Sequence, residues 1–165
     1  MVNLDIAGLE VVPLLWSVQA MQRALERVRA TGWDDPVGGF AAIGETLWWI
    51  GVAGDRLRTQ YERSFFNALA EELEGTDRLL AGLRFARNRI GHGVDKVNYV
   101  AATATESLSF RATWTWKSMA ERPSGNNQGF AEYQSDVAGK DVVQTLLRAS
   151  VFLAQVAQRV SDHLL

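Results

Sequence analysis

Long stretches of helical periodicity constrain the fold of this chain more than any other feature. Apolar side chains recur every three or four residues from Pro13 to about Ala30, from about Pro36 to Tyr61 and from about Lys140 to His163. This spacing places the apolar side chains on one face of a helix, which must be buried against another element. A helix tolerates proline best in its first turn, so we expect the first helix to begin near Pro13.

The segments between these helices predict a smaller helical part and a β excursion. Residues 62–75 have a weaker helical pattern, and Thr76 or Asp77 can cap the helix that follows. Apolar and polar residues then alternate from Leu108 to Trp116, as in a half-buried strand. After a turn-rich loop, an extended return from Phe130 to Tyr133 could pair with that strand as a hairpin.

These elements predict one mainly α domain over residues 1–165. Its architecture would be a bundle of four to five helices, with a small β-hairpin insertion at about 107–134 before the last helix. A helical bundle is favoured over an α/β sheet because only one or two strands are credible.

The composition excludes several kinds of site. Cysteine is absent, which rules out disulfides, thiolate zinc sites and thiol nucleophiles. The only two histidines are far apart in sequence, so we expect no histidine-rich metal site and no cofactor. No apolar run is long enough to cross a membrane and no signal-peptide pattern is present, so a cytoplasmic protein is expected. The net charge of −2 also argues against general attraction to nucleic acid.

The stretch from Gly82 to Gly93 concentrates the chemically useful side chains. It holds three of the 14 arginines and one of the two histidines, and no acidic residue lies between Asp77 and Asp95. We expect a helix that ends at Gly91 or Gly93 and that turns one apolar stripe to the core. The members of that stripe are Leu79, Leu83, Ala86 and Ile90.

The other side of the same helix is polar. Arg84, Asn88 and His92 follow one another at intervals of four residues, and Arg87 lies one turn from Arg84. A guanidinium, an amide and an imidazole would therefore converge where the helix ends, and the flanking glycines let the backbone leave the helix at His92. If the chain has an active site, we expect it here.

The sequence Arg87-Asn-Arg-Ile-Gly-His92 resembles the Arg-(four to six residues)-His motif of the HEPN superfamily. A polar residue, often Asn, commonly follows the arginine of that motif, and Asn88 stands in this place. The resemblance covers the bundle as a fold class, but its specific residues are Arg87, Asn88 and His92. The β excursion at about 107–134 is not part of the family's minimal pattern.

The resemblance implies a metal-independent endoribonuclease with catalytic Arg87 and His92 and a supporting Asn88. It also implies a homodimer whose composite site combines two copies of the motif. The RNA partner would be single-stranded or tRNA-like. By analogy with the family, the protein would have a toxin or anti-phage role with a possible cognate antitoxin. The residues suit this chemistry, because imidazole can accept the 2′-OH proton and guanidinium fits phosphate oxygens.

The spacing of Arg87 and His92 is itself a reason to expect a dimer. On an ideal helix the two side chains point about 140° apart. A single subunit would bring them together only if the helix ends at Gly91 and His92 swings round. A two-fold axis between two such helices would instead place two arginines and two histidines in one cleft.

Arg84 and Glu45 are candidates for supporting roles. Arg84 shares the polar edge of its helix and could contact a substrate phosphate. Glu45 lies among Trp48, Trp49 and Val52, on the second apolar side of the 36–61 helix. It would either orient an arginine or His92, or form an ordinary buried ion pair with one of the arginines at 84–89. Asp55 has the same two interpretations with less support.

Two other functions remain open. The chain could be a catalytically inactive helical module that binds a nucleotide, RNA or a protein, with His92 serving only as a helix cap. It could also be a purely structural dimer whose interface is the Trp48/Trp49 face. Trp114 and Trp116 could stack bases, but packing of their strand on the bundle is favoured.

Overall fold

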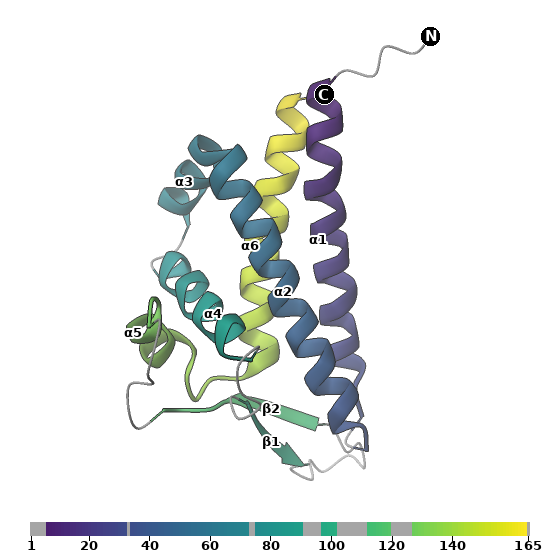
Figure 1. The fold of residues 1–165 in the computed structure, drawn as a ribbon, viewed down its shortest axis with the longest axis vertical. Coiled ribbons are helices and arrows are strands. Elements are labelled where there is room, and N and C mark those ends of the chain that lie inside the picture. Colours follow the sequence, from purple (N-terminus) through teal and green to yellow (C-terminus); the bar gives the residue numbers. More distant parts are fainter. Residues whose placement is uncertain are drawn as a thin grey trace.

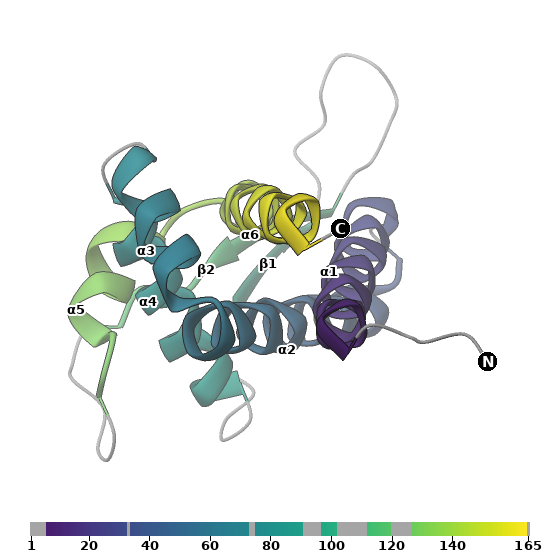
Figure 2. The same ribbon diagram turned by 90° about the horizontal axis from the view of Figure 1, so that it is seen from above.

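A computed structural model describes residues 6–32, 34–72, 75–90, 97–101, 112–119 and 127–164. Over these residues the chain is mainly helical, as the periodicity predicted. Three long helices form the body of a bundle: α1 (Ile6–Ala30), α2 (Pro36–Gln60) and α6 (Val142–Leu164). They pack on one another, and the first turn of α1 lies beside the last turn of α6 (Figures 1 and 2).

The shorter elements cover the side of α2 and α6 that faces away from α1. Here lie α3 (Glu62–Glu71) and α4 (Thr76–Ile90), with the short helix α5 (Phe130–Glu132) and the π-helical turn η1 (Tyr133–Val137) outside α4 (Figure 2). The strands β1 (Val97–Ala101) and β2 (Ala112–Trp116) lie at one end of the bundle (Figure 1). The helix bounds agree closely with prediction for α2, α4 and α6.

The start of α1 differs from prediction. The helix begins at Ile6, seven residues before Pro13, which is therefore in its interior. Val11 and Leu14, on either side of this proline, are almost completely buried in the bundle. Most helical stability in proteins comes from such packing, which here offsets the hydrogen bond that Pro13 cannot donate.

The β excursion is real, but its partner strand was predicted wrongly. β2 pairs with β1, in antiparallel register from Val97 opposite Trp116 to Ala101 opposite Ala112. The segment proposed as the return strand, Phe130–Tyr133, is helical instead. The rest of the predicted strand, residues 108–111, lies outside the described residues.

Contacts with α4 explain why the segment after residue 129 is helical. The ring of Phe85 lies 5.5 Å from that of Phe130 and 5.2 Å from that of Tyr133. Gly82 makes this approach possible, because a Cβ at this position would lie 3.0 Å from the backbone nitrogen of Tyr133. Burial raises the pKa of Tyr133 to about 12, and its hydroxyl donates to the Lys117 carbonyl at 2.6 Å.

Trp116 joins the hairpin to the bundle. Its side chain is fully buried, and its Nε1 donates to the hydroxyl of Thr145 on α6 at 2.6 Å. Its backbone N–H donates to the carbonyl oxygen of Lys140, and its own carbonyl oxygen accepts from the backbone N–H of Gly139. Trp114 is also buried, so these two side chains belong to the core rather than to a base-stacking surface.

Candidate functional site

Two arginines of the polar edge predicted on the 76–90 helix, Arg84 and Arg87, face α2. Leu79, Leu83 and Ala86 are buried, which confirms the apolar stripe on the described part of α4. Arg84 and Arg87 are partly buried against α2, with 31% and 23% of their side chains exposed. Two guanidiniums are thus held in the contact between two helices, where they lose much of their contact with water.

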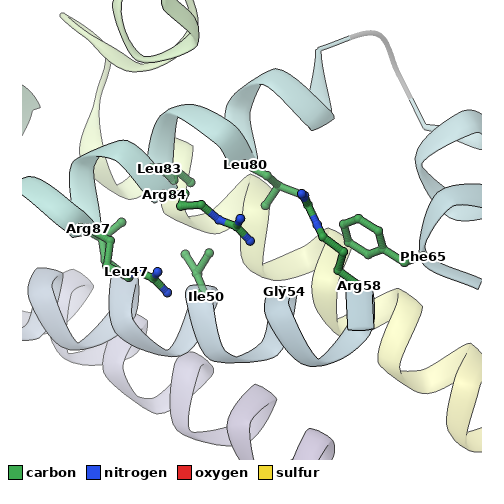
Figure 3. A pocket seen from close by; sticks show the side chains of 10 residues that line it. Leu47, Ile50, Gly54, Arg58, Phe65, Leu80, Leu83, Arg84 and Arg87 are labelled. Carbon is green, nitrogen blue, oxygen red and sulfur yellow. The ribbon is translucent and has the colours of Figure 1, made fainter. Parts of the chain in front are cut away.

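A narrow groove between α2 and α4 contains these arginines. Arg58, from α2, lines the same groove, and Leu47, Ile50, Leu80 and Leu83 supply apolar walls. Figure 3 shows the side chains of Arg87, Arg84 and Arg58 in that order along the groove. The space open to the centre of a water-sized sphere is about 20 Å³, which is roughly the room that one water molecule needs.

Asp55 is the acidic partner of this arginine row. Its carboxylate accepts a hydrogen bond from Nη2 of Arg84, and its second oxygen lies 3.7 Å from Nη1 of Arg87. The carboxylate is about half exposed. It is therefore placed to hold two guanidiniums beside one another, with their remaining N–H groups available to another anion.

Gly51 makes room for Arg87. A Cβ at residue 51 would lie 1.8 Å from Nη1 of Arg87 and 3.0 Å from its Cδ. The guanidinium therefore lies directly over the backbone of α2, where only glycine leaves space for it. Gly54, three residues later, has no such role, because its nearest neighbour beyond the helix would be Leu153 Cδ2 at 4.0 Å.

Asn88 is exposed next to Arg87. Its Oδ1 accepts from Nε and Nη2 of Arg87, at 3.4 Å in each case, which is long for a hydrogen bond. His92 lies outside the described residues. The last described residue of α4 is Ile90, so the direction of His92 relative to Arg87 stays a prediction.

Glu45 does not belong to this site. Its carboxylate pairs with Arg27 of α1, and 45% of its side chain is exposed, so it is neither buried nor close to an arginine of α4. The reason is its position on α2. Ten residues separate Glu45 from Asp55, which at 100° per residue turns the two carboxylates about 80° apart, one toward α1 and the other toward α4.

The second side of α2 is apolar and partly uncovered. Trp49 shares a shallow surface groove with Trp16 of α1, and its chain neighbour Trp48 is 59% exposed. Trp16 itself is 66% exposed. The two exposed tryptophans, one on α1 and one on α2, leave large apolar side chains in contact with water.

Arg58 was not singled out from the sequence, although a signal was present. Residues 47, 51, 54 and 58 follow one another at spacings of four, three and four, so Arg58 ends a helical stripe that includes two glycines. Two small residues beside an arginine on one helical face leave space for side chains from a neighbouring helix.

Comparison with known proteins identified no relative of this chain. No protein-family model matches the chain, and neither a curated protein nor a solved structure matches it. Within the described ranges, no helix is long and apolar enough to cross a membrane, and no three His, Asp or Glu side chains gather closely enough to hold a metal ion.

Proposed function

We propose that this protein is a metal-independent endoribonuclease of HEPN type that uses Arg87 and His92, with Asn88 and Arg84 in support. The observation that carries the proposal is the pair of guanidiniums, Arg84 and Arg87, held against α2 immediately before the segment that contains His92. A helical bundle around an Arg-Asn-x-x-x-His sequence is also what the resemblance to the HEPN superfamily implies.

The chemistry follows from the substrate. RNA carries its own nucleophile, so cleavage requires a base that removes the 2′-OH proton, and an imidazole with a pKa of about 6.5 suits this step near neutral pH. The 2′-oxygen attacks phosphorus and the P–O5′ bond breaks, giving a 2′,3′-cyclic phosphate and a 5′-hydroxyl. Arg87 donates to the phosphate oxygens as negative charge develops on them.

Incubation with total RNA in EDTA tests this proposal. We expect the wild-type protein to degrade or nick RNA when all divalent metal is chelated. Protein that binds RNA but leaves it intact would favour the inactive binding module. Protein that neither binds nor cleaves RNA would contradict both the ribonuclease and the RNA-binding module, and would leave the structural dimer as the remaining function.

Replacing Gly51 by alanine is expected to lower RNA cleavage about tenfold or more, because the added methyl group displaces the Arg87 guanidinium from its place over α2. The displaced atoms are the far end of a flexible side chain, and alanine gains roughly 0.8–1.0 kcal/mol in helix propensity, so the melting temperature should hold or rise.

Gly54→Ala is the matched control for this variant. It adds the same methyl group to the same helix without meeting Arg87, although Gly54 also lines the groove. It should raise the melting temperature and leave RNA cleavage well above that of Gly51→Ala. Equal cleavage by the two alanine variants would show that the position of Arg87 over Gly51 is unimportant.

The second candidate function is a structural dimer, and the exposed Trp16 and Trp48 favour it. The proposed ribonuclease also needs a homodimer, but one in which two copies of α4 meet. Replacing both tryptophans by serine is expected to convert a dimer into a monomer, measured as molar mass by light scattering. Val37→Ser, at a residue of α2 that is 78% exposed, should leave the mass unchanged. A double variant that remains dimeric would exclude these two tryptophans from the interface.

A further inference from the structure

Arg58 extends the cationic row of the groove beyond the residues assigned to catalysis. Arg58 is exposed, and its guanidinium carbon lies 5.4 Å from the centre of the fully buried Phe65 ring, a cation–π contact. No carboxylate of the described residues pairs with it. Among the described residues its N–H groups therefore have no carboxylate partner and face solvent.

The charge of the groove selects an anion. Three guanidiniums line the groove, and the Asp55 carboxylate pairs with those of Arg84 and Arg87 but not with that of Arg58. Apolar walls of leucine and isoleucine lower the local dielectric constant and strengthen attraction for a negative group. The row thus carries excess positive charge on a chain whose net charge is −2.

The size of the groove limits which parts of an anionic ligand can enter it. The space open to the centre of a water-sized sphere, about 20 Å³, admits a small group such as a phosphate oxygen but no nucleobase. Several guanidiniums in a row match the repeated charges of a nucleic-acid backbone better than a single free phosphate. Bases would stay outside, so contact along this row would be independent of sequence.

We propose that the groove binds the backbone of single-stranded RNA, with Arg58 contacting a phosphodiester next to the one that is cleaved. The choice of RNA over other phosphodiesters rests on the proposed function; the choice of a backbone phosphate rests on the groove itself. Arg58 is a binding residue, whereas Arg87 acts at the reacting phosphate. The strand would lie along α2, in the direction from Arg87 through Arg84 to Arg58 (Figure 3).

The test measures binding of a fluorescent 2′-O-methyl RNA oligonucleotide, which lacks the nucleophile and cannot be cleaved. Arg58→Gln is expected to weaken binding by the full-length protein about tenfold, the effect of losing one charge-assisted hydrogen bond. The slope of log affinity against log salt should fall by about 0.7, as for one lost phosphate contact on a single strand. Arg58→Lys should keep the slope.

Two controls make the result specific to the groove. Arg29→Gln removes a surface arginine that is 51% exposed and paired with Glu26, and it should change neither affinity nor slope. Circular dichroism must show the same helix content for the Arg58 variants as for the wild type. A folded Arg58→Gln protein with wild-type affinity and slope would overturn the proposal, as would inorganic phosphate or polyglutamate that competes as strongly as the oligonucleotide.

His92→Ala separates this inference from the proposed function, because it should bind the oligonucleotide as the wild type does while failing to cleave RNA. If the wild-type protein binds the oligonucleotide through Arg58 but cleaves no RNA, the backbone site is supported and the ribonuclease is contradicted. If the Arg58 variants cleave RNA and bind the oligonucleotide as the wild type does, the ribonuclease is supported and the backbone site at Arg58 is contradicted.

Discussion

Replacing Arg87 by alanine is expected to lower the rate of RNA cleavage about 100-fold or more, the usual effect of removing one preorganised donor to a developing oxyanion. The fold should survive, because Asp55 keeps its hydrogen bond from Arg84. Arg87→Lys should recover only part of the rate, since an ammonium restores the charge but not the planar fork. Single-turnover cleavage with excess protein in EDTA measures the effect directly.

Arg89→Ala is the matched control, two residues further along α4. Its guanidinium lies over the Phe85 ring and donates to Asn127, away from the α2 groove, so its loss should leave the cleavage rate within about threefold of wild type. His92→Ala should abolish cleavage as Arg87→Ala does. An Arg87→Ala protein as active as Arg89→Ala would exclude Arg87 from the reaction.

Replacing Trp116 by alanine is expected to destabilise the protein by about 3–5 kcal/mol, the range for deleting a large buried aromatic side chain. The side chain is fully buried, and its loss also leaves the Thr145 hydroxyl without the indole N–H that it accepts. Chemical denaturation, followed by circular dichroism, should show a large fall in the transition midpoint. The result would establish that the hairpin is part of the bundle core rather than an appendage.

Phe66→Ala provides the comparison for Trp116. This aromatic residue is 47% exposed on α3, so its truncation should cost well under half as much. Thr145→Val keeps the Trp116 ring but removes the acceptor of its N–H, which should cost roughly 1–3 kcal/mol. A Trp116→Ala protein as stable as Phe66→Ala would mean that the hairpin contributes little to the core.

Helical periodicity predicted most of this fold because the long helices bury one continuous face. The prediction was wrong where tertiary contacts override local signals. Pro13 is tolerated inside α1 because its neighbours are buried, and Phe130–Tyr133 is helical because the two aromatic rings pack on Phe85. β1 was missed, since Val97–Ala101 is a short run without clear alternation.

The candidate site was predictable in part. The arginines of α4 and the edge they occupy follow from helical spacing alone, and so does the buried stripe beside them. The acidic partner of these arginines could not be predicted from spacing, because both Glu45 and Asp55 lie on α2. Only the packing of α2 places Asp55 beside the arginines of α4 and Glu45 beside Arg27. Arg58 could not be assigned to the site from the sequence, because its contact with the Phe65 ring is a tertiary contact between α2 and α3.

The chemistry of the cleaved ends tests the central claim most directly. Cleavage by 2′-OH attack in EDTA must leave a 2′,3′-cyclic phosphate and a 5′-hydroxyl, and a substrate with a 2′-deoxy residue at the cleavage site must stay intact. The account predicts both results for the wild-type protein and no products for His92→Ala. Products with a 5′-phosphate, or cleavage that requires an added divalent metal, would contradict it.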